Sequence, residues 1–399
     1  MKNFSITQWI VIIILALLTA LEPLSIDLYL PGFIKMSEAF SVPVSSVQIS
    51  LTTFLGGFAL GQLIWGPLAD KYGRKKPIIA SLLIYILATF ACIHVRNIEQ
   101  MWVLRFVQAI GGSGGIVIAR AIVTDYFDKS QTLKIFALLA LIMGVAPIIA
   151  PICGNLIINL LGWKGSFEVL VALGIILALL TIFLLPETHK VKTRFTITSY
   201  WQVLKVKQFL LYAVLAGLVN GGLMVYVANG PFLIMEKGGF SGNYFSVIFA
   251  FNAFGLMIAS VIAGISQKYI SASSLVKIST TIWIISSIAL VTTMYFNADI
   301  LIILAILFIY LFTLGILLPS TTERALIPFT DNSGTASSLF GAIQLGIAFV
   351  CSIASNYMDN GTIINVGIGL GICSLLGFMA IIFPKTRRMV LQKARIISK

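Results

Sequence analysis

Apolar and polar residues follow one another along this chain in long blocks. Twelve apolar runs, each long enough to supply the about 20 residues that a helix needs to cross a bilayer, are separated by short polar connections. The runs lie near residues 8–31, 48–69, 77–95, 100–122, 133–156, 166–186, 209–229, 242–265, 275–296, 299–319, 335–356 and 361–384. Unbroken runs of this length predict helices, because the strands of a membrane barrel give shorter, alternating segments.

One connection is longer and more basic than the others, and it divides the runs into two sets of six. It covers residues 187–207 and contains His189, Lys190, Lys192, Arg194, Lys205 and Lys207. The pattern predicts an all-α integral membrane protein with two pseudo-symmetric six-helix bundles, at 1–186 and 208–399. A faint repeat agrees with this division, since Gly66-x-x-x-Asp70 after the second run has a counterpart in Gly264-x-x-x-Lys268 after the eighth.

Composition and charge support a membrane protein and give it an orientation. The chain is 59% hydrophobic and only 10% charged, whereas soluble domains average about 25% charged residues. Its net charge of +13 comes from short loops and the C-terminal tail, which favours membrane orientation over nucleic-acid binding. With both termini placed inside, 21 of the 27 Lys and Arg residues are cytoplasmic, and the rest are Lys35, Arg96, Arg105, Arg120, Lys164 and Lys237.

Cysteine and histidine are too sparse and too scattered for a metal site or a disulfide framework. None of the four cysteines forms a Cys-x-x-Cys pair, and the two histidines are far apart. No clustered catalytic set is visible, so we expect neither an enzyme nor a bound cofactor. The first apolar run lacks a small-x-small cleavage site before Glu22, and we expect it to stay as the first helix.

A short charged hairpin joins the second and third runs. It reads Gly66-Pro-Leu-Ala-Asp70-Lys-Tyr-Gly73-Arg74-Lys-Lys. Gly66 permits a close approach of backbones and Gly73 can supply a left-handed turn, while Asp70 offers a carboxylate among four cations. The positive charges beside the hydrocarbon predict a cytoplasmic loop.

Three charged residues inside the spans are candidates for transport chemistry. Each costs about 3 kcal/mol to insert at a helix centre, so each is expected to have a functional or structural role. Glu22 and Asp27 lie in the first span, and five residues at about 100° each predict that they occupy different faces. Arg105 in the fourth span lies at a depth similar to that of Asp27, which makes it a counter-ion candidate for either acid. Exchange of a proton for a cationic substrate and a static ion pair are both compatible with this pattern.

Further polar residues suggest the wall of a substrate cavity. Gln108 lies one turn from Arg105 and can share its hydrogen bonds. Tyr29, Asn220, Tyr226 and Asn229 are the other cavity candidates, although such groups bridge helices as easily as they bind substrate. The inner end of the fourth span carries two more charges, and we expect both to join the cytoplasmic charge network: Arg120 and Asp125.

The fifth span carries two prolines four residues apart among small residues. The segment reads Gly144-Val-Ala-Pro147-Ile-Ile-Ala-Pro151-Ile-Cys-Gly154-Asn155. Prolines kink a helix, and small residues leave a flat face for close packing. We therefore expect this helix to contact the other half of the molecule.

The hairpin at Gly66–Arg74 resembles the signature loop of the major facilitator superfamily, and Arg105-x-x-Gln108 is similar to its fourth-span motif. The fifth-span segment resembles the Ala-Pro-x-x-Ala-Pro-x-x-Gly motif of drug:proton antiporters, with Asn155 where a second glycine usually follows. Together with Asp27-Leu-Tyr29-Leu-Pro31 and the run from Ser333 to Gln344, these motifs resemble the bicyclomycin/chloramphenicol-resistance (Bcr/CflA) family.

The resemblance implies a proton-coupled transporter that exports drugs or related small amphipathic molecules across the bacterial inner membrane by alternating access. It implies proton coupling through Asp27 with Arg105 as its partner, whereas Glu22 lies outside the matched motif. Asp70, Gly73 and Arg74 would latch the cytoplasmic side, and the pattern at Pro147, Pro151 and Gly154 would favour antiport. We expect a monomer whose partners are protons, a small molecule and the bilayer. A dedicated exporter of a metabolite or siderophore, or a proton-coupled importer, is the alternative.

Overall fold

The computed structural model describes residues 5–188, 197–329, 333–358 and 361–397, which are almost entirely helical. The charged linker residues His189, Lys190, Lys192 and Arg194 lie outside them. The helices are α1 Ile6–Asp27, α2 Phe33–Phe40, α3 Val44–Tyr72, α4 Lys75–Ile93, α5 Ile98–Tyr126, α6 Lys129–Leu161, α7 Trp163–Leu184, α8 Ile197–Leu204, α9 Lys207–Pro231, α10 Gly242–Ser266, α11 Ala272–Tyr295, α12 Ile300–Leu326, α13 Ser333–Tyr357 and α14 Ile363–Ile397. Two short pieces, η1 Leu30–Gly32 and η2 Phe232–Lys237, extend α1 and α9.

Twelve spans in the described residues are long and apolar enough to cross a membrane, which confirms the predicted number and order. Several spans run past the apolar block into polar residues. The second, for example, begins at Val44 rather than near residue 48, because Val47 and Gln48 are buried against neighbouring helices. Tertiary packing therefore sets the ends of these helices more than hydropathy does.

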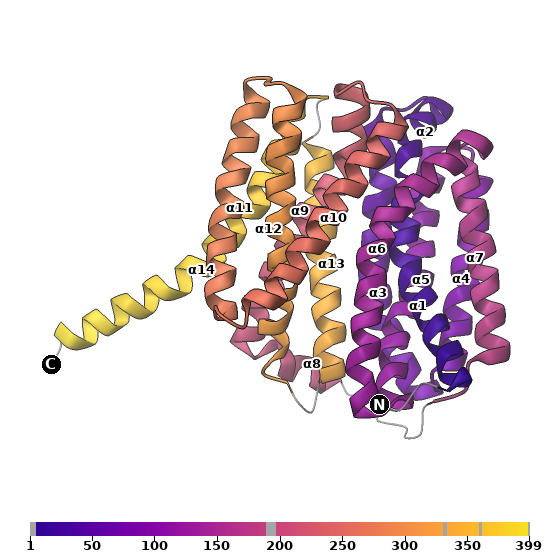
Figure 1. Ribbon diagram of the computed structural model, residues 1–399, viewed down its shortest axis with the longest axis horizontal. Helices are drawn as coiled ribbons and strands as arrows, with labels where there is room; N and C mark the ends of the chain where they lie inside the picture. The colour runs from indigo at the N-terminus through magenta and orange to yellow at the C-terminus, as the bar shows by residue number, and fades with distance from the viewer. Residues whose placement is uncertain (1–4, 189–196, 330–332, 359–360, 398–399) are drawn as a thin grey trace.

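The spans stand roughly parallel, with α1–α7 on one side of the molecule and α9–α13 on the other (Figure 1). The short helix α8 lies at one end of the spans and α2 lies at the opposite end. We call these ends the α8 face and the α2 face. The described start of the chain and the turn between α3 and α4 belong to the α8 face.

The two halves meet along two helix pairs, α3 with α13 and α6 with α10. In the first pair, the hydroxyl oxygens of Thr52 and Ser352 are 2.8 Å apart, and Asn356 Nδ2 donates to Thr52 Oγ1 at 3.0 Å. In the second pair, Ser246 Oγ donates to the carbonyl oxygen of Pro151 at 2.9 Å. These contacts lie toward the α2 face. One more hydrogen bond between the halves, from Ser338 Oγ to the Gln62 carbonyl oxygen at 3.2 Å, lies nearer the α8 face, so the described hydrogen bonds between the halves are concentrated toward the α2 face.

Gly154 lets α6 approach the end of α1. A Cβ atom at this position would lie 2.1 Å from the carbonyl oxygen of Leu28, which leaves no room for any side chain. The next residue, Asn155, donates from Nδ2 to Oδ1 of Asn243 in the other half. Its amide fits because the facing residue is Gly242, where a Cβ would lie 2.5 Å from Asn155 Oδ1. The helix with two prolines thus contacts both α1 and the second half.

We expect Gly154→Val to destabilise the protein by about 1–3 kcal/mol, because the added side chain would force α6 away from α1. Thermal unfolding of the purified protein, followed by intrinsic fluorescence, measures this effect. The matched control is Gly264→Val in α10, where a Cβ meets nothing within 4 Å. Equal melting temperatures for the two variants would contradict this account of the α6 packing.

Candidate functional site

A cavity of about 710 Å³ lies between the two halves. The helices that line it are α1, α3, α5 and α6 from one half and α9, α10, α12 and α13 from the other. Apart from α3, which contributes Gln62 alone, each helix contributes residues three or four positions apart, as expected when one face of a helix is turned to a cavity. On α13 these are Ser337, Phe340, Gly341, Gln344 and Leu345.

The cavity lies toward the α8 face. Its lining includes Leu326, the last residue of α12, and Ser337 in the first turns of α13, both near that end. Its other limit includes Asp27, the last residue of α1. The hydrogen bonds between the halves close the α2 face beyond it, so the structure corresponds to a state with its cavity on the α8 side.

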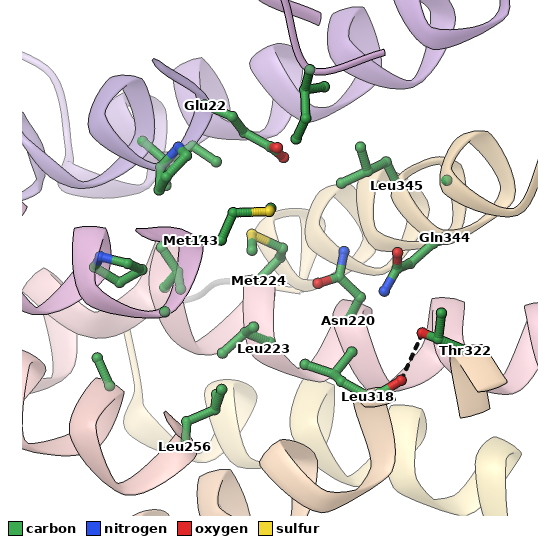
Figure 2. Close-up of a pocket in the computed structure, with 18 of the residues that line it drawn as sticks. Glu22, Met143, Asn220, Leu223, Met224, Leu256, Leu318, Thr322, Gln344 and Leu345 are labelled. Atoms are coloured by element: carbon green, nitrogen blue, oxygen red, sulfur yellow. Dashed lines mark hydrogen bonds between the residues drawn. The ribbon is translucent and has the colours of Figure 1, made fainter. Parts of the chain in front are cut away.

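Both acids of the first span line this cavity. Glu22 is partly buried and its carboxylate points into the space (Figure 2). Asp27 retains only 3% of its exposure, and no hydrogen bond or ion pair of its side chain occurs among the described residues. The two acids reach the same cavity although they lie on different faces of α1, because the cavity wraps around this helix and also contacts Pro23 and Ile26 between them.

Arg120 also lines the cavity, so the prediction that it joins the cytoplasmic charge network is wrong. It lies one helical turn after Ile116 on the same face of α5, and Ile116 is a lining residue too. Its electrostatic partner is Glu22 on α1. The position of Arg120 near the end of α5 suggested that it lies close to the membrane surface, but the cavity extends to that depth and Arg120 lines it.

Amide and aromatic groups form the opposite wall. Asn220 on α9 and Gln344 on α13 turn their amides toward the same space (Figure 2). Asn252 Nδ2 donates to the Tyr226 hydroxyl at 2.9 Å, and the Tyr226 ring stacks on Phe249 with 5.5 Å between centroids. This wall offers hydrogen-bonding groups on a fixed aromatic base.

Methionine side chains fill the middle of the cavity. Met143 of α6 and Met224 of α9 end in the space between the two halves (Figure 2), and Met257 of α10 lines it as well. Thioether side chains are flexible and polarizable, and they adapt to ligands of different shape. The apolar part of the cavity can therefore adapt to ligands of different shape.

Arg105 lies outside this cavity, fully buried among the helices of the first half. Its guanidinium donates from Nη1 to Gln108 Oε1 at 2.5 Å and from Nη2 to the Ser25 carbonyl oxygen at 2.9 Å. The rings of Tyr29 and Phe54 lie 4.4 and 4.3 Å from its central carbon. Among the described residues it makes no ion pair with Glu22 or Asp27, so the structure does not bring the expected counter-ion to either acid.

Three of the five predicted cavity residues lie elsewhere in the structure. Tyr29 packs on Arg105, and Gln108 donates from Nε2 to Thr89 at 2.8 Å within the first half. Asn229 Nδ2 donates to the carbonyl oxygen of its own helix at Val225, at 2.9 Å. Only Asn220 and Tyr226 line the cavity, because the side chains of a helix divide between its packed faces and the cavity.

The turn between α3 and α4 forms a charge cluster within the first half. Arg74 donates from Nη1 to Asp70 at 2.6 Å and from Nε to Asp125 at 2.7 Å. Burial alone would lower the pKa of Arg74, but these two hydrogen bonds outweigh it and raise that pKa, so the residue stays charged. Gly66 lies beside α13, near Ser338.

Sequence reasoning missed the third carboxylate of this cluster, Glu187. It accepts from the backbone N–H groups of Arg74 and Lys75, at 2.8 and 3.1 Å. Gly73 has φ +89°, and a Cβ there would lie 2.7 Å from Glu187 Oε2, so the turn requires glycine. The first backbone N–H groups of a helix have no partner within it, so the start of α4 was expected to need an acceptor such as this carboxylate.

No group of three or more metal-binding side chains occurs in the described part of the chain. The free cysteines there are Cys92, Cys153, Cys351 and Cys373.

Comparison with known proteins identifies the family. The model for the Major Facilitator Superfamily matches residues 15–344. The chain belongs to this superfamily. It is 32% identical to the Bacillus subtilis protein named "Uncharacterized MFS-type transporter YdgK", over 96% of each chain. It is 27% identical to the Haemophilus influenzae "Bicyclomycin resistance protein homolog", over 96% of this chain and 98% of that one. Identity to the "Multidrug resistance protein MdtL" of Vibrio parahaemolyticus is 28%, over 84% and 85%.

Solved structures of the superfamily share the fold. A D-xylose-proton symporter superposes with a TM-score of 0.80 at 13% identity, covering 94% of this chain and 96% of that one. The nucleoside transporter NupG superposes with a TM-score of 0.72 at 16% identity, covering 93% and 100%. This major facilitator protein is thus a multi-pass membrane transporter of small molecules, not an enzyme.

In this major facilitator protein, we expect Arg105→Lys to lower stability although it keeps the charge. A lysine ammonium cannot reproduce the planar fork that bonds Ser25 and Gln108 together, and hydrogen bonds to charged groups contribute about 1.5–3 kcal/mol. Unfolding in a titration with SDS measures the change, with the exposed Arg96→Lys as the control. Equal stability of the two variants would contradict this account, because it would show that the positive charge at position 105 is sufficient and that the guanidinium hydrogen bonds are not needed.

Proposed function

We propose that this protein exports drugs or related amphipathic molecules from the bacterial cytoplasm in exchange for protons. The observation that carries the proposal is the pair of carboxylates, Glu22 and Asp27, in a largely apolar cavity between two halves. Relatives named for bicyclomycin and multidrug resistance support export of such compounds. The protein would act as a monomer, without a cofactor, driven by the proton gradient.

The acids suit proton coupling for a physical reason. An unpaired carboxylate is costly in apolar surroundings, and a bound proton or a cationic ligand removes that cost. Glu22 is reached from the cavity, whereas Asp27 is nearly closed off. Binding of a cation beside Glu22 would release a proton from its carboxylate. After the cation has left, the carboxylate in the closed cavity would again be unpaired and would favour binding a proton. One site would thus serve protons and substrate in turn.

Transport by this scheme needs the two bodies, residues 1–186 and 208–399, to rock about the cavity. We propose that the α8 face is cytoplasmic, with both termini on that side, because its loops carry most of the Lys and Arg residues. The hydrogen bonds at Thr52, Pro151 and Asn155 then form the outer gate. The cluster at Asp70, Gly73 and Arg74 would latch the cytoplasmic side in the opposite state, and Pro147, Pro151 and Gly154 would let α6 flex between the two.

Asp27→Asn and Glu22→Gln should each abolish proton movement driven by substrate while leaving the protein folded, because neither amide exchanges protons. Purified protein in liposomes with an imposed pH gradient, probed with a panel of lipophilic cations, chloramphenicol and a siderophore, measures this flux. The exposed Glu99→Gln at the start of α5 is the matched control. Full exchange by Asp27→Asn would remove that residue from the mechanism.

The same panel separates the alternatives. A response of the unmodified protein to one compound alone would indicate a dedicated metabolite or siderophore exporter. Movement of substrate in the same direction as protons, rather than in the opposite direction, would indicate an importer and contradict the proposal.

Alternating access predicts that a covalent link at the α2 face stops transport. In a chain with its four natural cysteines replaced, Thr52→Cys with Ser352→Cys should form a disulfide on oxidation, because the two hydroxyl oxygens are only 2.8 Å apart. We expect at least about a tenfold loss of flux that a reductant restores. The single Ser352→Cys variant controls for oxidation itself. Full transport by the linked protein would contradict opening of this face.

A further inference from the structure

Arg120 is a cation that the cavity holds without a close partner. Its side chain is exposed to the cavity and makes no hydrogen bond or ion pair among the described residues. The neighbouring carboxylate on the same helix, Asp125, is already bound to Arg74 at 2.7 Å. The second arginine of α5, Arg105, is fully buried and faces aromatic rings inside the first half. Arg120 is therefore the cavity residue positioned to receive an anionic group.

Glu22 lies at a different level of the same wall. Gly115 of α5 packs against Leu18 of α1, which fixes the relative height of the two helices. From that contact, Arg120 lies five residues toward the α8 face and Glu22 lies four residues toward the α2 face, since the helices are antiparallel. At about 1.5 Å per residue, the two Cα atoms differ in height by roughly 13 Å. The charged ends approach enough to interact electrostatically but do not form an ion pair.

We propose that Arg120 and Glu22 together select zwitterionic amphipaths, binding an acidic group at Arg120 and an amine at Glu22. This inference rests on the proposed function and names its substrate class. The apolar body of such a molecule would lie against the apolar part of the lining, where Met143, Met224 and Leu345 face the same cavity as Glu22 (Figure 2).

The arrangement disfavours ligands with one sign of charge. A purely anionic molecule bound at Arg120 meets the carboxylates of Glu22 and Asp27 farther in. A purely cationic molecule passes Arg120 before it reaches Glu22. A ligand with both groups in the matching order satisfies both side chains, and like charges held close together are avoided.

A matched pair of probes tests this selection. Norfloxacin carries an amine and a carboxylate at opposite ends of a flat ring system, and its ethyl ester keeps the amine but lacks the carboxylate. Binding of each to the purified full-length protein is measured by equilibrium dialysis at neutral pH, without any proton gradient. Because no transport is involved, the result is independent of whether the protein exchanges protons.

We expect Arg120→Gln to weaken norfloxacin binding at least about tenfold, since a charge-assisted hydrogen bond is lost. The same change should leave binding of the ester within about twofold or strengthen it, and Arg120→Lys should retain most of the norfloxacin affinity. Glu22→Gln should weaken both probes, because both carry the amine.

Three results would overturn the proposal. These are unchanged norfloxacin binding by Arg120→Gln, an equal loss of both probes in that variant, and failure of norfloxacin to bind the unmodified protein. A folding defect is separated from these results by thermal unfolding of each variant and by the Arg120→Lys protein. Failure of the proton-exchange proposal would instead appear as an absence of coupled flux in liposomes with selective binding intact.

Discussion

The cost of placing a charge in hydrocarbon governs where every charged side chain of this transporter lies. A charge within a span must have hydrogen bonds, an opposite charge or access to water. Arg105 is stabilised by a carbonyl oxygen, an amide and aromatic faces. Arg74 is neutralised by two carboxylates. Glu22, Asp27 and Arg120 instead line a shared cavity, and for that reason we propose that they are the functional charges.

The packing between the halves follows from the same constraint. Small residues and hydroxyl groups join α3 to α13 and α6 to α10, where they supply hydrogen bonds without burying charge. Such contacts are modest in strength and can be exchanged for others when the bodies rock. We propose that the charges of the cavity determine which ligand makes that exchange favourable, since only differential binding shifts a conformational equilibrium.

The sequence was sufficient for the fold because the length of a membrane span is set by the bilayer. Twelve apolar runs predict twelve helices, and the motifs in order indicate the superfamily. The cavity was harder to predict, since a helix with charges at several positions does not reveal which of its faces meets a neighbour. Arg105 and Arg120 are both arginines of one span, yet one is packed in aromatic rings and the other is in the cavity. Similarly, Glu187 lies 113 positions after Arg74, whose backbone N–H it caps.

Release of protons on substrate binding tests the central claim most directly, because it asks whether one cavity holds both ligands in turn. Purified protein in weakly buffered detergent solution is titrated with norfloxacin, whose amine is expected to bind beside Glu22, while a pH indicator records protons. The account predicts proton release that saturates together with binding and is lost when both Glu22 and Asp27 are replaced by amides. Saturable binding without any proton release would contradict a shared site for protons and substrate.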